Sequence, residues 1–279
     1  MKELEKKSGY IPTADGALLY YYEMGQGTPL VLVHGVLCSS QFWKYNVEEL
    51  AKEYRVIGYD LRAHGYSTKV AEGNNIPKYG DDLHALIEAL KLEDAALVGW
   101  SIGGQVVLDY YHKYGQAGKI SKLCLVDAPV APMGDYAWNA HVMRDHNYEK
   151  LAQLLQNMSK NTDIYLQSFV ERQLHSKEIL EANKGWMKEE VSKIPIWAGV
   201  SIFSDFVSRD YVFALKDVNV PTLVFGTNSQ TYATGIQMAQ KVAEMLPDAV
   251  FATIADTGHA MFIDKPSEFN RILLNFLQS

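Results

Sequence analysis

A serine in a glycine-rich turn is the feature of this sequence best suited to chemistry. The segment Gly99-Trp100-Ser101-Ile102-Gly103-Gly104 follows the apolar run 95–98 and precedes a helical pattern at 105–110. Such a strand-turn-helix arrangement leaves no room for side chains at positions 99 and 103, and it pushes the Ser101 hydroxyl to the tip of the turn. The first N–H groups of the helix then point to where an oxyanion would form. The turn therefore predicts a nucleophilic serine, although an ordinary turn with a capping serine has the same outline.

Apolar runs on both sides of this turn predict the sheet that positions it. Residues 8–22 have a hairpin pattern that turns at Asp15-Gly16. Six further strands are expected, at Leu30–Val33, Arg55–Tyr59, Ala96–Trp100, Lys122–Val126, Thr222–Phe225 and Val250–Ile254. Helices are expected near Gln41–Lys52, Lys78–Leu90, Ile102–Tyr114, Ile236–Leu246 and Ser267–Leu277. Near-continuous apolar strands that alternate with helices are typical of a doubly wound α/β fold, here with a mostly parallel sheet of eight strands.

The strand signal disappears between Pro129 and about Asp217, where helical stretches rich in aromatic residues and methionine take its place. We interpret residues 129–217 as a helical cap inserted into a core formed by residues 1–128 and 218–279. Several aromatic side chains of this cap could line a pocket for an apolar or aromatic compound: Trp138, Tyr165, Phe169, Trp186, Trp197, Phe203 and Phe206. Plain core packing is the better expectation for each one, so none is singled out.

Composition narrows the class of function. The formal net charge of −7 is spread along the chain, which argues against a nucleic-acid surface. The first residues lack the apolar core of a signal peptide and no apolar run approaches a membrane span, so a cytoplasmic protein without a membrane partner is expected. Cys38 and Cys124 fit reduced thiols, and the His/Cys spacing of a metal site is missing. We expect a small-molecule substrate and neither a metal nor a cofactor.

Polar residues directly follow the predicted strands, at the edge where ligands of open parallel sheets bind. The segments that carry them are 34–37, 60–67, Ser101 and Gly258-His259, the last of which is followed by Asp264-Lys265-Pro266. In the order and spacing of these motifs, the chain resembles the α/β-hydrolase superfamily over almost its whole length outside the cap.

The resemblance implies a role for each matching residue. Ser101 corresponds to the nucleophile, and His259 in the last strand-to-helix loop corresponds to the general base. The backbone N–H groups of Val36 and Ile102 correspond to the oxyanion hole. His34 is expected to order the oxyanion loop rather than to act on a substrate.

The acid of the triad is where the sequence departs from the common pattern. Most relatives carry an aspartate after the seventh strand, but residues 226–235 contain no carboxylate. Glu244 comes next and falls inside the following helix, while Asp256 lies in the same loop as His259 and would rarely reach its far nitrogen. Asp127 ends the sixth strand beside the nucleophile strand, a position used by haloalkane dehalogenases, a fungal lactonase and cofactor-free dioxygenases of the superfamily. We therefore favour Asp127 as the acid, against the alternative that it only caps the first turn of the cap.

These residues predict a serine hydrolase that cleaves a small apolar or aromatic ester or lactone through an acyl-enzyme at Ser101. A hydroxyl nucleophile disfavours dehalogenation and epoxide hydrolysis, which use a carboxylate. A cofactor-free ring-cleaving dioxygenase with a His259/Asp127 base dyad remains an alternative, as does a ligand receptor that turns over slowly.

The remaining polar residues have structural interpretations. Asp60, Arg62 and His64 are expected to form a hydrogen-bonded structural cluster. Five further histidines lack a companion motif and are expected at solvated or core positions: His84, His112, His141, His146 and His175.

Overall fold

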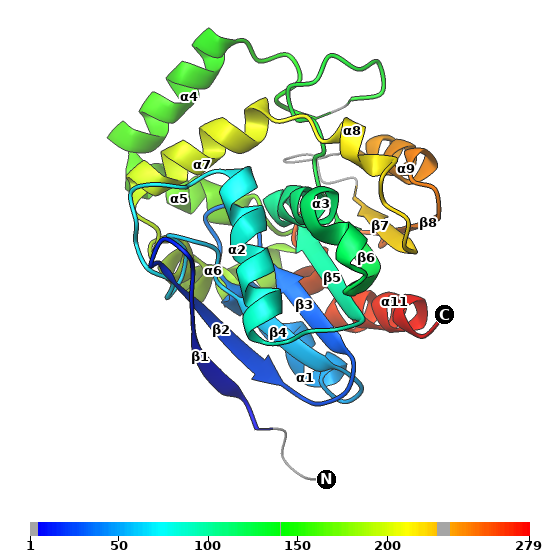
Figure 1. Ribbon diagram of the computed structural model, residues 1–279. Helices are drawn as coiled ribbons and strands as arrows, with labels where there is room; N and C mark the ends of the chain where they lie inside the picture. Colours follow the sequence, from blue (N-terminus) through cyan, green and yellow to red (C-terminus); the bar gives the residue numbers. More distant parts are fainter. Residues whose placement is uncertain (1–4, 140, 228–234) are drawn as a thin grey trace.

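The computed structural model describes residues 5–139, 141–227 and 235–279 (Figure 1). Within these ranges the chain forms one eight-stranded sheet in the order β1-β2-β4-β3-β5-β6-β7-β8. Its strands are β1 (Lys7–Pro12), β2 (Leu18–Met24), β3 (Pro29–Val33), β4 (Arg55–Tyr59), β5 (Ala95–Trp100), β6 (Ile120–Val126), β7 (Thr222–Gly226) and β8 (Ala249–Thr253). The hairpin β1–β2 is antiparallel and joins β4 antiparallel, whereas β4, β3, β5, β6, β7 and β8 pair in parallel. The predicted mostly parallel α/β sheet is confirmed.

Helices cover both faces of the sheet. Those of the core are η1 (Ser40–Trp43), α1 (Lys44–Leu50), α2 (Ile76–Ala89), α3 (Ile102–Tyr114), η2 (Gly115–Ala117), α9 (Gly235–Met245), α10 (Met261–Asp264) and α11 (Pro266–Gln278). Helices α2 and α3 pack together on one face, and α1 and α11 pack together on the other (Figure 1). Every residue of β5 is buried, as expected of a central strand covered on both sides.

Two helical regions differ from the sequence prediction. Helix α2 begins at Ile76 rather than near Lys78, because the Asn75 side chain accepts a hydrogen bond from the Lys78 N–H and Pro77 fits the first turn. The helix expected over 41–52 is divided into η1 and α1. Neither change moves the strand ends that carry the polar residues.

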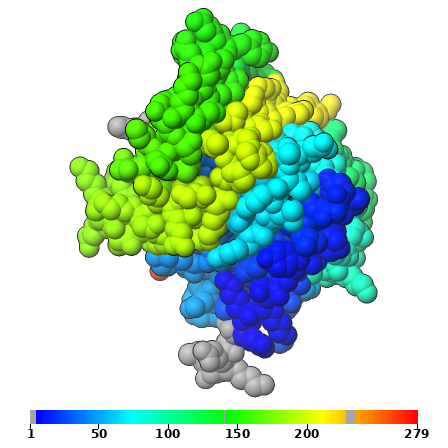
Figure 2. Space-filling view, turned by 90° about the vertical axis from the view of Figure 1, so that its left-hand side faces the viewer, coloured from blue at the N-terminus to red at the C-terminus, as the bar shows by residue number. Residues whose placement is uncertain are grey.

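Residues between β6 and β7 form five helices in the described part of the segment, and no strand there: α4 (Tyr148–Lys160), α5 (Thr162–Glu171), α6 (Lys177–Val191), α7 (Ile196–Ser208) and α8 (Val212–Leu215). Figure 2 shows these segments, green to yellow, gathered in the upper and left part of the view, above the blue N-terminal strands. The division into core and cap at 129 and 217 stays our interpretation. In the described ranges, no helix has the length and apolar character needed to cross a bilayer.

Candidate active site

Ser101 stands in a strained turn between β5 and α3. Its backbone has φ 56° and ψ −122°, a conformation that costs a non-glycine residue roughly 1–3 kcal/mol. A Cβ at Gly99 would lie 2.4 Å from the carbonyl oxygen of Gly103, and one at Gly103 would lie 2.5 Å from that of Val33. The glycines are therefore required by backbone contacts, and the turn holds the serine at the carboxyl end of β5.

Asp127 and His259 meet although 132 positions separate them along the chain. Asp127 follows β6 with φ 43°, a left-handed conformation that aspartate tolerates better than most residues, and its N–H donates to the Phe225 carbonyl at 3.0 Å. The carboxylate is fully buried, and its Oδ2 lies 2.6 Å from Nδ1 of His259. Because Nδ1 donates this bond, the neutral ring presents Nε2 as a proton acceptor.

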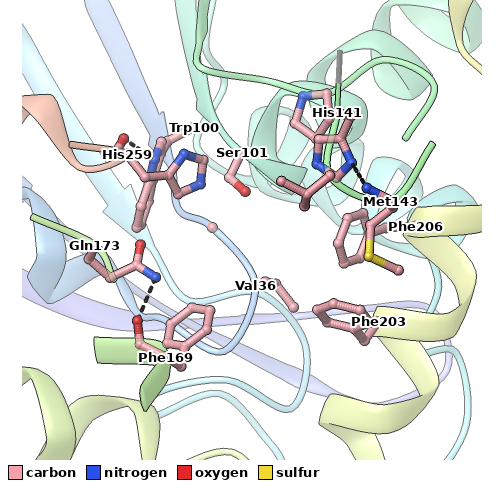
Figure 3. Close-up of a pocket in the computed structure, with 13 residues that line it drawn as sticks. Val36, Trp100, Ser101, His141, Met143, Phe169, Gln173, Phe203, Phe206 and His259 are labelled. Atoms are coloured by element: carbon pink, nitrogen blue, oxygen red, sulfur yellow. Dashed lines mark hydrogen bonds between the residues drawn. The ribbon is translucent and has the colours of Figure 1, made fainter. Parts of the chain in front are cut away.

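The His259 ring also lies against the nucleophile strand. The Trp100 indole N–H donates to the His259 backbone carbonyl at 3.0 Å, and the two ring centroids are 5.2 Å apart. Figure 3 shows the His259 ring beside the Ser101 hydroxyl, and both residues line the same cavity. The structure thus brings the three predicted side chains, Ser101, His259 and Asp127, to one edge of the sheet.

Two buried histidines hold the loop that follows β3. The His34 ring donates from Nδ1 to the Gly35 carbonyl and accepts at Nε2 from the Leu61 N–H. His64 accepts at Nε2 from the Leu37 N–H. Burial lowers the pKa of both imidazoles, so each is neutral and can act as an acceptor at physiological pH. These bonds fix the backbone on either side of Val36.

Val36 and Ile102, whose backbone N–H groups are expected to form an oxyanion hole, both lie next to the Ser101 turn or its cavity. Val36 lines the cavity with Ser101, and Ile102 is the first residue of α3, where N–H groups have no intrahelical acceptor. Within the described ranges, neither N–H donates to another protein group. The oxyanion hole at these two N–H groups therefore stays a prediction.

A small cavity lies above Ser101. Its walls come from the strand ends and from the cap: Gly35, Val36, Trp100, Ser101, Pro129, His141, Val142, Met143, Phe169, Gln173, Phe203, Phe206 and His259. Most of these side chains are apolar, and the aromatic ones converge on the space beside Ser101 (Figure 3). The cavity therefore accommodates a small, largely apolar molecule.

Comparison with known proteins agrees with this geometry. Residues 28–266 match the family described as alpha/beta hydrolase fold. The chain belongs to the alpha/beta hydrolase fold family. The matched range contains the turn at Ser101, the loop after β3, the His259 loop and the cap.

Proteins similar to this chain are named as haloperoxidases and esterases. The chain is 28% identical to the "Non-heme chloroperoxidase CPO-A1" of Kitasatospora aureofaciens, covering 95% of this chain and 98% of that one. It is also 28% identical to the "Bifunctional esterase/perhydrolase DCH" of Acinetobacter calcoaceticus, covering 97% and 100%. The crystal structure of a bromoperoxidase from Bacillus anthracis superposes with a TM-score of 0.88 at 25% identity, covering 98% and 100%. Esterases and haloperoxidases are thus both among the relatives, which supports a hydrolase.

The other carboxylates weighed as triad acids lie elsewhere. Glu244 is in α9, 64% exposed at its side chain and paired with Lys241. Asp256 is 78% exposed and lies 3.9 Å from the Lys265 ammonium. Positions 228–234 of the loop after β7, which carries no carboxylate in the sequence, lie outside the described residues.

Asp60, Arg62 and His64 have structural hydrogen bonds, as the sequence suggested, but among the described residues each side chain bonds to its own partners rather than to the other two side chains. Asp60 accepts from the Ser40 N–H at 2.7 Å and from the Tyr66 N–H at 2.7 Å. Arg62 pairs with both Asp82 and Asp15. None of these side chains lines the cavity above Ser101.

Sequence reasoning missed the residue that holds the His259 loop against the cap. The Asp264 carboxylate accepts from the Gly258 N–H at 2.7 Å and from the His175 N–H at 3.0 Å. Nearby, the Ala260 N–H donates to the Gln173 carbonyl at 2.9 Å. The base loop and the cap segment 173–175 are therefore one hydrogen-bonded unit. The motif Asp264-Lys265-Pro266 was the only sequence signal for it.

The pocket walls also differ from the expectation. Of the aromatic residues considered, Phe169, Phe203 and Phe206 line the cavity, while the tryptophans of the cap do not. His141 is buried, which agrees with the core position that was one of its two expected places, and it also lines the cavity together with Gln173. Nothing near either residue in the sequence marks it, because the folding of the cap brings both to the cavity.

Proposed function

We propose that the protein is a serine hydrolase that cleaves a small apolar or aromatic ester or lactone through an acyl-enzyme at Ser101. The observation that carries this proposal is the 2.6 Å contact of Asp127 with His259, beside a serine held in a strained turn. A serine hydroxyl needs a neutral imidazole to take its proton, and the imidazolium that forms needs a carboxylate. The esterase relative supports the same chemistry.

Acylation starts with the attack of the Ser101 oxygen on the substrate carbonyl. His259 takes the hydroxyl proton at Nε2, while Asp127 holds Nδ1–H and stabilises the charged ring. The carbonyl oxygen becomes an oxyanion that accepts from the N–H groups of Val36 and Ile102. His259 then gives its proton to the leaving oxygen, and the acyl group stays on Ser101.

Deacylation repeats these steps with water. His259 removes a proton from water, the hydroxide attacks the acyl carbonyl, and the Ser101 oxygen leaves with the proton returned by the ring. The products are a carboxylic acid and an alcohol, or one hydroxy acid when the substrate is a lactone. The apolar walls and the small size of the cavity support a small substrate with a hydrocarbon or aromatic part.

Turnover of a panel of short-chain nitrophenyl esters and lactones tests the proposal. The native protein is expected to hydrolyse several of them. The Ser101→Ala variant is expected to lose at least 10³-fold in kcat, because removing the nucleophile of a serine-protease triad costs about 10⁶-fold. Absence of turnover on the whole panel would contradict the proposal. A His259→Ala variant that loses oxygen consumption on a hydroxylated heteroaromatic ring, while Ser101→Ala keeps it, would favour the dioxygenase alternative.

A second candidate reaction follows from the relatives named for haloperoxidase and perhydrolase activity. Hydrogen peroxide in place of water would attack the same acyl-enzyme and release a peracid. Peracid formation from acetate or an ester in the presence of peroxide, measured against the Ser101→Ala variant, tests this second use of the intermediate. Peracid formed equally by the variant would exclude it.

A further inference from the structure

Two polar side chains in the wall of the cavity have no part in the proposed triad. Among the described lining residues these are His141 and Gln173, which both come from the cap. Figure 3 shows them on opposite sides of Ser101, with Gln173 on the side of His259. The remaining cap residues of the wall are apolar, so these two determine which polar groups a ligand can present there.

His141 is a hydrogen-bond donor toward the cavity. Its Nδ1 lies 3.1 Å from the Met143 backbone nitrogen, which donates to it. Burial, together with the nearby His259 and His146, lowers the pKa of His141 to about 3. A neutral ring whose Nδ1 accepts must carry its proton on Nε2, and in Figure 3 that side of the ring faces Ser101.

Gln173 is an acceptor toward the cavity. Its side-chain nitrogen donates to the Phe169 carbonyl at 3.0 Å, which fixes the orientation of the amide, because the reverse orientation would place two oxygens against each other. The Oε1 atom is buried and has no hydrogen-bond partner among the described residues. Buried polar atoms without partners are rare in folded proteins and call for an explanation such as a bound group.

We propose that this pair selects oxygenated substrates, namely esters or lactones that carry a hydroxyl or oxo group in addition to the reacting carbonyl. An oxygen on one side of the carbonyl accepts from His141 Nε2–H, and a hydroxyl on the Gln173 side donates to Oε1. A plain hydrocarbon ester would leave both buried groups unpaired. This inference rests on the proposed hydrolase function and specifies its substrate class.

A series of matched esters tests the inference. Methyl butanoate has no second polar group, methyl 3-oxobutanoate has an acceptor only, and methyl 3-hydroxybutanoate has both a donor and an acceptor. Further members are methyl 2-hydroxybutanoate and the corresponding hydroxylated lactones. We measure kcat/KM for each and compare the ratio of substituted to unsubstituted ester between native and variant proteins. Differences in intrinsic reactivity cancel in that comparison.

The His141 variants separate the inward donor from the contact within the cap. Asparagine places its Oδ1 where Nδ1 stands and so keeps the acceptor for the Met143 N–H, but it removes the donor. His141→Asn is expected to lower the preference for the oxo and hydroxy esters about tenfold, which corresponds to one lost hydrogen bond. His141→Gln, whose amide reaches the position of Nε2, is expected to restore much of it. His112→Asn, on the half-exposed face of α3, is the matched control and should leave the ratio unchanged.

Gln173→Met removes the acceptor at similar volume and is expected to lower the preference for the hydroxy ester while sparing the oxo ester. Calorimetric binding of the same esters to the Ser101→Ala protein measures the preference without turnover. Unchanged ratios in both His141→Asn and Gln173→Met, with active enzyme, would overturn the substrate class and leave the hydrolase proposal intact. Absence of turnover on every ester would overturn the hydrolase proposal. The calorimetric ratio of substituted to unsubstituted ester would then still test whether His141 and Gln173 select oxygenated ligands.

Discussion

Replacing Asp127 by asparagine removes one negative charge from the site while keeping the size of the side chain. The carboxylate is fully buried and lies 2.6 Å from the imidazole, so the amide stays within the same packing. Its NH₂ group can donate to Nδ1, which would force the ring proton onto Nε2 and leave no acceptor for the Ser101 hydroxyl.

The expected loss can be worked out from this distance. Two opposite charges 2.6 Å apart attract by about 6 kcal/mol at the effective dielectric constant of about 20 that suits protein sites. This attraction exists only when the ring is charged, as it is in the transition state, and about 6 kcal/mol corresponds to between four and five powers of ten in rate. We therefore expect Asp127→Asn to reduce kcat by about 10⁴-fold with little change in KM.

The assay is hydrolysis of the best nitrophenyl ester over pH 5 to 9, with circular dichroism to check the fold of the variant. Asp256→Asn is the matched control, because that carboxylate is 78% exposed and lies in the same loop as His259. It should retain native kcat. An Asp127→Asn enzyme within tenfold of the native kcat would refute the reasoning, and a large loss in Asp256→Asn instead would assign the acid to the other residue.

Three further predictions follow from contacts around the site. A Cβ at Gly104 would lie 2.3 Å from the Cβ of Ala128. Gly104→Ala is therefore expected to displace Asp127 and to lower the free energy of unfolding, measured by denaturant titration, by about 1–3 kcal/mol. A variant as stable as the native protein would contradict this contact. Asp264→Ala removes the acceptor for three backbone N–H groups, those of Gly258 in the base loop and of His175 and Ser176 in the cap. It should reduce kcat by one to two powers of ten, while Glu244→Ala does not. The pKa of buried His141 is lowered to about 3 in the folded protein. As the pH falls below about 6.5, this histidine therefore takes up a proton in the unfolded chain but not in the folded protein. Stability should therefore drop by about 2 kcal/mol from this group between pH 7 and pH 5, and a flat unfolding free energy over that range would contradict it.

The positions of strands and helices could be predicted because their apolar runs are long and regular. The strands that end at Val33, Tyr59, Trp100 and Val126 are buried over most of their length and pair in parallel. Such burial requires continuous apolar residues, so the pattern is visible without coordinates. Helix ends were less accurate, since α2 starts where the Asn75 side chain caps it rather than where the apolar pattern begins.

The approach of Asp127 to His259 was foreseeable from topology alone. Parallel strands end at the same edge of a sheet, and the loops after β6 and β8 lie on either side of β7 there. The cavity wall was not foreseeable in the same way. His141 and Gln173 lie far from Ser101 in sequence, and they reach the cavity only because the cap folds back onto the base loop, where Ala260 N–H bonds to the Gln173 carbonyl. No periodicity within the cap encodes that contact.

Covalent labelling with a fluorophosphonate tests the central claim most directly, because the reagent reacts only with a serine activated by a neighbouring base and phosphonylates its oxygen. Intact mass and peptide mapping of the labelled protein are expected to place one phosphonyl group on Ser101. The second-order rate should fall by at least 10³-fold in Asp127→Asn and in His259→Ala, in line with the loss of general-base activation. No label on Ser101, or equal labelling rates in these variants, would contradict the account.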